Sequence, residues 1–290
     1  MKRLLFVGLC VVLVPVAGRA QSPDQKKAAV AYLQPLQQKD GGFVPAAKET
    51  KTSLRATSSA LRALKYFGGA AKDKDAAATF VKSCFDKESG GFADAPGGKP
   101  DVALTAVGVM ALVELKLSTE PYEPGVLKYL GENAKEFDQI RIAAAGLEAL
   151  GKQPPQAKAW LDQVRKMANA DGTYGKGDGS ARDTGSSVVV VLRLGGKDEN
   201  SDAILKTLNA GQRKDGGFGK ADANGSDLET SYRVLRAYHM LKAKPEGVKA
   251  LREFVAKCRN QDGGYGVEPG KPSNVSGTYF AASILHWLGE

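Results

Sequence analysis

One short pattern recurs along the chain: an aspartate or serine, two small residues, and then an aromatic residue. The first copy is Asp40-Gly41-Gly42-Phe43, and further copies end at Phe92, Tyr174, Phe218 and Tyr265. Each copy follows a segment with helical periodicity and precedes another such segment. Glycine is suited to the left-handed conformation that ends a helix. The pattern therefore predicts a series of helix pairs, each ended by glycine.

The spacing of the copies indicates the number of repeats. Successive copies lie 49, 82, 44 and 47 residues apart. The long step equals two repeats, which predicts a degenerate repeat near residue 130. We expect its outer helix over Val126–Leu130 and its inner helix over Ile140–Leu150, with Phe137 as the remnant of the aromatic residue. Six pairs with amphipathic first helices and nearly all-apolar second helices favour a closed ring over an open solenoid. The predicted fold is all-α, an (α/α)6 toroid.

A column of threonines sets the expected register of the six inner helices. Eleven residues before the helix end, five repeats carry a threonine and the third carries Ala143. The threonines are Thr57, Thr105, Thr184, Thr230 and Thr278. We expect their hydroxyls to form hydrogen bonds within the first helical turn. The run Ser186–Leu192 has strand propensity, but it occupies the same column, so we predict helix there.

The first twenty residues have the features of a secretory signal peptide. Lys2 and Arg3 precede the apolar run Leu4–Val16, and small residues precede a cut after Ala20. Removal of residues 1–20 leaves residues 21–290 as a single toroid domain, expected to be secreted or periplasmic. No other stretch has the length or apolarity of a membrane span, so no transmembrane segment is expected.

Charge and cysteine content narrow the function classes. The formal net charge is +9, and loss of three basic residues with the signal leaves +6. Basic and acidic residues are interspersed, which favours a solvated mixed-charge surface over nucleic-acid binding. Cys84 and Cys258 lie in apolar helix stripes of repeats that are not neighbours. We therefore expect two buried free thiols rather than a disulfide.

Two segments resemble a known family. Phe85–Val102 is similar to a repeat of the protein prenyltransferase β subunits, especially the Rab geranylgeranyl type, and Cys258–Gly266 is similar to another. The wider group is the prenyltransferase and squalene-oxidase repeat, which squalene and oxidosqualene cyclases share. The resemblance covers all six repeats. It is specific for the toroid and much less specific for an activity.

The resemblance also implies a catalytic zinc ion. In the prenyltransferases its ligands are an aspartate four residues before the column, a cysteine two before it, and a histidine one before it. Only Asp101 matches here, and no cysteine or histidine stands at the other two positions. His239 and His286 lie two turns further along their helices. We therefore expect no metal and no other cofactor. The cyclases' Asp-x-Asp-Asp acid is absent from the sequence as well.

Polar residues near the starts of the inner helices should converge at one mouth of the barrel. The candidate catalytic acids are Asp183, Glu229 and Asp101. Asp183 and Glu229 are expected at matching positions of neighbouring repeats, where carboxylates could share a proton or perform acid–base chemistry. The alternative role for these acids is to stabilise helix N-termini. The arginines of this region could bind a diphosphate or carboxylate, or could pair with the same acids. The candidate ligand-binding residues are Arg55, Arg141, Arg182, Tyr232, Asn274 and Tyr279.

Three functions fit these residues. The first is a secreted, non-catalytic toroid that binds a ligand or protein at the inner-helix mouth. The second is an active transferase or terpene cyclase-like enzyme with a rebuilt acidic site; the family resemblance favours it, and the missing cysteine and histidine oppose it. The third is a structural envelope protein. At the level of the sequence, the question whether the chain is an enzyme stays open.

Overall fold

The computed structural model describes residues 21–290, and the expected signal peptide lies outside the described residues. Within residues 21–290, twelve α-helices alternate between outer and inner positions. The outer helices are α1 (Pro23–Leu33), α3 (Lys74–Ser83), α5 (Glu123–Asn133), α7 (Ala157–Arg165), α9 (Ser201–Ala210) and α11 (Val248–Lys257). The inner helices are α2 (Leu54–Tyr66), α4 (Val102–Glu114), α6 (Phe137–Leu150), α8 (Ser180–Arg193), α10 (Leu228–Met240) and α12 (Val275–Trp287). Two short 3-10 segments, Gln34–Leu36 and Gly177–Gly179, complete the described helices.

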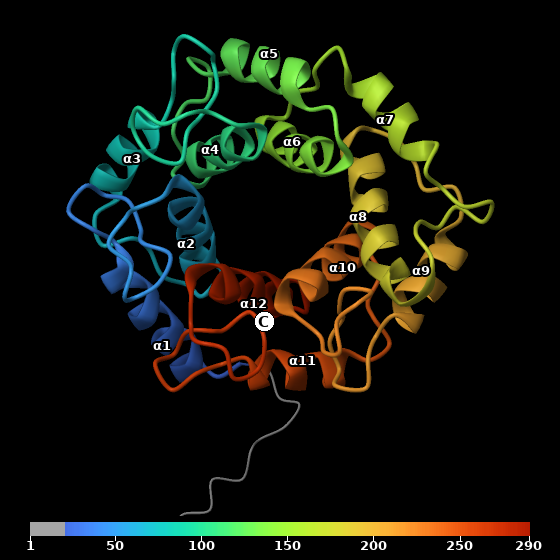
Figure 1. Ribbon diagram of the computed structural model, residues 1–290. Helices are drawn as coiled ribbons and strands as arrows, with labels where there is room; N and C mark the ends of the chain where they lie inside the picture. Colours follow the sequence, from blue (N-terminus) through green and yellow to red (C-terminus); the bar gives the residue numbers. More distant parts are fainter. Residues whose placement is uncertain (1–20) are drawn as a thin grey trace, which may run out of the picture.

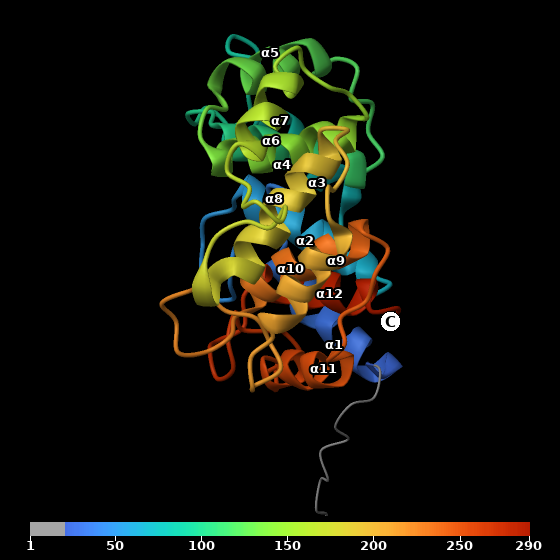
Figure 2. The ribbon, with the colours of Figure 1, turned by 90° about the vertical axis from the view of Figure 1, so that its right-hand side faces the viewer.

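The helices form two concentric rings (Figure 1). Each inner helix contacts the next, and α12 packs against α2, so the inner ring is closed. Figure 2 shows the ring from its edge, with α5 at the top, α11 at the bottom and inner helices between them. β-Structure in the described chain is limited to isolated bridges. The predicted all-α (α/α)6 toroid is confirmed.

The third repeat forms a complete helix pair. Its helices α5 and α6 begin about one turn earlier than the predicted Val126–Leu130 and Ile140–Leu150, and α5 also ends later. The side chains of Glu136 and Gln139 form a capping box at the start of α6, which explains the early start. Only residues 134–136 join α5 to α6, whereas residues 84–101 join α3 to α4. The helical prediction for Ser186–Leu192 is confirmed, because that run lies within α8.

The aromatic residue of each glycine pattern is anchored to an inner helix by its backbone. The N–H of Phe43 donates to Oγ1 of Thr57 at 2.9 Å, and the N–H of Phe92 donates to Oγ1 of Thr105 at 3.0 Å. The same bond joins Tyr174 to Thr184 and Tyr265 to Thr278. The hydroxyls of Thr57 and Thr278 also donate within the first turn, as predicted, whereas that of Thr184 donates to the Tyr174 carbonyl. For example, Oγ1 of Thr57 donates to the Ser53 carbonyl at 2.7 Å.

The register of two repeats differs from the sequence prediction. In the fifth repeat, Phe218 donates to Ser231 at 3.0 Å, whereas Thr230 bonds Asp227. Counting eleven residues back from the left-handed residue that ends each inner helix gives the same result: Lys242 leads to Ser231, and Gly151 leads to Ile140. The predicted assignment of Ala143 and Thr230 to the column was therefore wrong, and Ile140 and Ser231 occupy these positions. The third repeat has no aromatic N–H to bind, so the fully buried Ile140 replaces the hydroxyl. In the fifth repeat, two adjacent hydroxyl residues made the choice ambiguous.

Loops of one repeat cap the inner helix of the preceding repeat. The first N–H of α2 donates to the Asp94 carbonyl at 2.7 Å, and that of α10 donates to the Val267 carbonyl at 2.8 Å. The first N–H of α12, from Val275, donates to the Pro45 carbonyl at 2.9 Å. Each acceptor stands two residues after an anchored aromatic. The last of these bonds joins the sixth repeat to the first and so closes the ring at this face.

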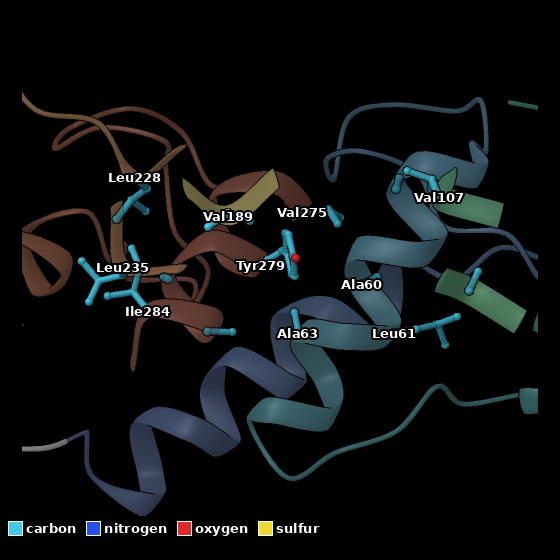
Figure 3. Packing of buried hydrophobic residues seen from close by; sticks show 14 of the residues in the cluster. Ala60, Leu61, Ala63, Val107, Val189, Leu228, Leu235, Val275, Tyr279 and Ile284 are labelled. Carbon is cyan, nitrogen blue, oxygen red and sulfur yellow. The ribbon is translucent and has the colours of Figure 1, made fainter. Parts of the chain in front are cut away.

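The core lies between the two rings and within the inner one. Figure 3 shows Leu235 of α10 beside Ile284 of α12, with Ala60 and Ala63 on α2. Small residues such as Ala60 and Ala63 are fully buried, which lets neighbouring inner helices approach closely. Cys84 and Cys258 are buried and unbridged, as predicted, and burial raises the pKa of both thiols to about 12. No helix of residues 21–290 is long and apolar enough to span a bilayer.

The aromatic anchors give a stability prediction. Thr105→Val keeps the side-chain shape but leaves the buried Phe92 N–H without an acceptor. We expect a loss of about 1–3 kcal/mol of unfolding free energy, the cost of one unsatisfied buried donor. Urea unfolding followed by circular dichroism measures it. The matched control is Thr79→Val on the exposed face of α3, expected to change stability by less than about 0.5 kcal/mol. Equal losses in both variants would contradict the anchoring role.

Candidate functional site

A cavity opens into the centre of the inner ring. Its volume is about 200 Å³, and all six inner helices line it. The corrected column consists of Thr57, Thr105, Ile140, Thr184, Ser231 and Thr278. Most lining residues stand two residues before a residue of this column, or one, two or five residues after it. This spacing presents one face of each helix to the centre. The polar lining residues are Arg55, Ser58, Ser59, Arg62, Arg141, Ser186, Arg193, Glu229, Tyr232, Arg233, Arg236, Ser276 and Tyr279.

Aromatic side chains of α10 and α12 form one wall of this cavity. The Tyr232 ring centroid lies 5.5 Å from that of Tyr279, and 5.2 Å from those of Phe280 and Trp287. The hydroxyls of Tyr232 and Tyr279 form a 2.9 Å hydrogen bond. Aliphatic residues of α4, α6 and α8 complete the apolar lining: Val107, Met110, Ile142, Ala145 and Val189. The cavity can therefore accept a ligand with substantial apolar surface.

Glu148 joins two of the cavity arginines. Its Oε2 lies 2.9 Å from Nε of Arg193 and 2.8 Å from Nη2 of Arg236, whose side chains are 8% and 15% exposed. Burial alone would raise the pKa of Glu148, but the two guanidinium groups outweigh burial and hold this pKa below its usual value. Glu148 is therefore ionised near neutral pH and neutralises part of the positive charge.

Glu229 and Asp138 pair with the arginines nearer the mouth. Glu229 accepts a 2.5 Å hydrogen bond from Arg233 and lies 4.0 Å from Arg182. Asp138 lies 3.1 Å from Nε of Arg141 and 3.8 Å from Arg233. Burial opposes ionisation of both acids, but the neighbouring arginines hold the pKa of Glu229 and of Asp138 below their usual values. Both carboxylates act as counter-ions here.

Positive charge remains in excess at this site. The six lining arginines and Arg182 give seven positive charges, whereas Asp138, Glu148 and Glu229 give three negative charges, a surplus of +4. Several polar atoms here also lack partners: Oγ of Ser186 and Nε of Arg182 and Arg236 are buried without a hydrogen bond. A site with spare cationic and polar groups is suited to an anion.

The two tyrosines respond differently to these charges. Burial raises the pKa of Tyr279. Burial also opposes ionisation of Tyr232, but Arg62 and Arg236 outweigh burial and lower the pKa of Tyr232. Arg62 lies over the Tyr279 ring at 5.0 Å and Arg236 over the Trp287 ring at 5.2 Å. The aromatic wall therefore also orients two of the arginines.

A family model now accounts for this architecture. The prenyltransferase α-α toroid domain matches residues 6–131 and 127–290. The chain belongs to this family. No curated protein matches the chain.

Solved structures of prenyltransferase-type toroids share the fold at low sequence identity. Candida albicans protein geranylgeranyltransferase-I, complexed with GGPP, is 12% identical with a TM-score of 0.67, over 81% of this chain and 84% of that one. The type II terpene cyclase MstE from Scytonema is 10% identical with a TM-score of 0.60, over 91% and 96%. A protein from Actinoplanes is 13% identical with a TM-score of 0.59, over 91% and 98%.

Most of the predicted mouth residues reach the cavity of this toroid. Arg55, Arg141, Glu229, Tyr232 and Tyr279 line it, and Arg182 contacts it through Glu229. The prediction that polar residues near the inner-helix starts converge is therefore met by these six.

The other three predicted residues have different surroundings. Asp101 caps α4 by accepting from the Leu104 N–H at 2.7 Å, and Asn274 caps α12 by accepting from the Gly277 N–H at 2.8 Å. Asp183 is exposed on α8. In the corrected register Glu229 aligns with Arg182, so the expected match of Asp183 with Glu229 was wrong. The error arose from choosing Thr230 instead of Ser231.

Sequence reasoning missed the deeper arginines. Arg62, Arg193, Arg233 and Arg236 lie more than one turn inside their helices, whereas the prediction considered only residues near the helix starts. A signal was present in the sequence. Arg55 and Arg62 are seven residues apart, and Glu229 precedes Arg233 by four, which places each pair on one helix face.

The cysteine and histidine zinc ligands of the family have no counterpart in the corrected register. The aspartate position holds Asp101 and Asp227, both of which cap helices. In the fifth repeat, Glu229 stands where the family has its cysteine ligand. In the fourth repeat, Asp183 stands where the family has its histidine ligand. Within residues 21–290, no three His, Cys, Asp or Glu side chains are grouped as metal ligands would be. The residues present therefore do not fit the zinc site.

The Glu148 cluster gives a pH-dependent prediction. Glu148→Gln leaves Arg193 and Arg236 without their counter-ion. Glu148 is 38% exposed, so screening limits the loss to about 1–2 kcal/mol at pH 7. Its pKa in the folded protein is below the ordinary value of about 4.3. The stabilisation of the folded protein by ionised Glu148 is thus fully present above a pH of about 4.3. It is lost as the pH falls through the pKa that Glu148 has in the folded protein. The difference between wild type and variant should therefore shrink toward pH 3.

Urea unfolding at a series of pH values from 7 to 3 measures this difference. Glu132→Gln, on the exposed face of α5, is the matched control and should differ little from wild type at every pH. A loss in Glu148→Gln that is independent of pH would exclude an ionic origin.

Proposed function

We propose that the toroid binds an amphiphilic ligand in its central cavity. The apolar part of the ligand packs on the aromatic wall, and its anionic head is held by arginine. The observation that carries this proposal is the surplus of arginine over carboxylate in a cavity that also has an aromatic wall and aliphatic lining residues. Apolar burial supplies about 25 cal/mol per Å², and guanidinium groups recognise phosphate or carboxylate oxygens in pairs. A purely structural envelope role leaves this surplus charge unexplained.

Similar structures hold ligands of this chemical class. The geranylgeranyltransferase structure contains GGPP, and a variant of MstE contains geranylgeranyl dihydroxybenzoate. Both ligands join a long isoprenoid chain to a polar head. The proposed ligand of this protein belongs to the same broad class, an apolar chain with an anionic head.

The site favours binding over catalysis. The zinc positions are unmatched, and Asp101 serves as a helix cap. Glu229 is ionised and paired with Arg233, so it is unsuited to donate a proton. A transferase or cyclase would need an acid, a metal or a nucleophile beside the cavity. We therefore propose a ligand-binding protein in place of an enzyme.

We further propose that the protein is exported and cleaved after Ala20. The described contacts suit this cut. The Gln21 nitrogen lies 2.6 Å from Oε2 of Glu290, a side chain that is 2% exposed and pairs with Arg252 at 2.7 Å. Cleavage would convert that nitrogen into an ammonium group facing a buried carboxylate. We expect intact-mass analysis of the exported protein to give a chain that starts at Gln21. A mass that retains residues 1–20 would contradict this proposal.

Ligand titration tests the binding function. We expect farnesyl diphosphate to bind saturably and more tightly than farnesol in isothermal titration calorimetry, because only the diphosphate meets the arginines. Phe280→Ala removes part of the aromatic wall. It should weaken both ligands by roughly 10- to 100-fold, given about 1.5–3 kcal/mol for one buried aromatic side chain.

Met167→Ala is the control for this titration, since Met167 is exposed outside the cavity. It should bind both ligands as wild type does. The proposal fails if neither ligand binds to the wild-type protein, or if Phe280→Ala binds both unchanged.

A further inference from the structure

The backbone just before α1 contacts the sixth repeat. The nitrogen of Gln21 donates to Oε2 of Glu290 at 2.6 Å, and the side-chain Nε2 of Gln21 donates to the hydroxyl of Tyr265 at 2.6 Å. These partners are 269 and 244 positions away in the sequence. Glu290 follows α12 and Tyr265 follows α11. Gln21 therefore links the first repeat to the segments that follow both helices of the last repeat.

Glu290 provides a buried carboxylate with one oxygen directed at Gln21. Its side chain is 2% exposed, and its Oε1 accepts a hydrogen bond from Nε of Arg252 at 2.7 Å. Nη2 of Arg252 also donates to the Leu288 carbonyl at 3.3 Å. Arg252 of α11 therefore holds the carboxylate in position and leaves Oε2 for the Gln21 nitrogen. A carboxylate removed from water is stabilised by a second positive charge at that oxygen.

Tyr265 holds the side chain of Gln21. The side chain of Tyr265 is buried, and its backbone N–H is anchored to Oγ1 of Thr278 at 3.0 Å. Burial raises the pKa of the Tyr265 hydroxyl, so this group is neutral near pH 7. Oε1 of Gln21 is itself buried without a hydrogen bond. The surroundings of Gln21 thus contain one more acceptor than its peptide N–H can satisfy.

Removal of the signal changes the chemistry of the Gln21 nitrogen. In the precursor this nitrogen belongs to a peptide bond, so it has one N–H and no charge. After a cut between Ala20 and Gln21 it is an α-amino group, whose ordinary pKa is about 7.7–8.0. It is then largely protonated at pH 7 and has three N–H donors, as any primary ammonium group does. The mature chain thus presents a cation to Glu290 and adds donors beside the unfilled Oε1 of Gln21.

The contact lies at the junction that closes the outer ring. Helices α1 and α11 are neighbours on that ring (Figure 1). The glycine loop of the sixth repeat packs directly on α1. A Cβ atom on Gly263 would lie 2.4 Å from the Ala28 carbonyl oxygen, and one on Gly264 would lie 2.7 Å from the Tyr32 ring. An ion pair between Gln21 and Glu290 therefore strengthens a junction that is already in close backbone contact.

We propose that Glu290, Tyr265 and Arg252 form a binding site for the mature N-terminus of this chain. The ammonium and amide groups of Gln21 are the ligand, and their binding fastens the first repeat to the sixth. The inference rests on the proposed cut after Ala20. It adds that removal of the signal stabilises the closed ring, so the precursor is the less stable form.

The site also protects the new terminus from a side reaction that is open to an N-terminal glutamine. The neutral amino nitrogen can attack Cδ of its own side-chain amide, which forms an N–C bond and releases ammonia. The product is an uncharged lactam that lacks the Nε2 group. In the folded protein Glu290 holds the nitrogen as an ammonium group and Tyr265 holds the amide. Both contacts disfavour the attack, and both would be lost after it.

Thermal unfolding at pH 7 tests the binding site. One chain is released from a fusion with Gln21 as its first residue, and a second chain keeps an additional glycine and serine before Gln21. We expect the first chain to unfold at a temperature about 2–4 °C higher, because its buried carboxylate has a cation in place of a neutral N–H. With Glu290→Gln in both chains, the two temperatures should be equal. Equal temperatures with Glu290 in place would overturn the proposal.

Mass spectrometry of the N-terminal peptide gives a second readout, which also serves if Glu290→Gln does not fold. During prolonged incubation at neutral pH, we expect Gln21 to stay uncyclised in the folded protein and to lose ammonia in urea. Tyr265→Phe frees the amide and should speed cyclisation several-fold. This variant should fold, because Phe43 and Phe92 occupy the same position in other repeats. Tyr174→Phe is the matched control and should behave as wild type. Equal cyclisation in folded and unfolded protein would contradict the protective role.

The outcomes separate this site from the proposed cut. The two chains have defined first residues, so their unfolding temperatures do not depend on where the precursor is cut during export. If the exported protein starts elsewhere but the chain that starts at Gln21 is the more stable one, the site stands and the cut is wrong. If the exported protein starts at Gln21 and the two chains unfold alike, the cut stands and the binding site is wrong.

Discussion

The toroid depends on one recurring hydrogen bond, from the backbone N–H of an aromatic residue to a hydroxyl near the start of an inner helix. The bond occurs at Phe43, Phe92, Tyr174, Phe218 and Tyr265. It fixes a loop against the inner ring and buries the aromatic ring between helices. The same loops present the carbonyl groups that cap α2, α10 and α12. Local glycine conformation, core packing and helix capping are therefore linked in the first, second and sixth repeats, whose loops carry both the anchor and the cap.

The cavity follows from this arrangement. Because the anchored loops set the axial position of five inner helices, residues at equivalent positions form levels around the centre. Apolar side chains are the ones expected at the centre of a closed barrel. The arginines depart from that pattern on α2, α6, α8 and α10. Five arginines of the site are stabilised by three ionised carboxylates, whereas no ion pair within residues 21–290 reaches Arg55 or Arg62 of α2. Departures of this kind from a regular pattern are expected at functional sites.

The sequence was sufficient to predict most of the fold. Glycine spacing predicted six repeats, including the third, and the column of hydroxyls predicted the register of four. It could not resolve the register where the anchored aromatic is missing, at Ile140, or where two hydroxyl residues adjoin, at Thr230 and Ser231. The site was predicted in part. Residues of the first turn, such as Arg55 and Tyr279, follow from helix starts. The importance of Arg62 and Glu148 depends on which arginines have partners, and only the packed helices determine that.

The bond from Val275 to Pro45 joins residues 230 positions apart. Closing a flexible loop of that length costs about 5 kcal/mol of chain entropy on the logarithmic law, apart from a constant. Neighbouring repeats can pair while the chain is still being made, because their contacts are local. The last inner helix obtains its cap only when the first repeat returns to meet it. Ring closure is then a late event in folding, and a partly made chain would expose the apolar inner helices of an open arc. Such a chain would be prone to associate with other copies.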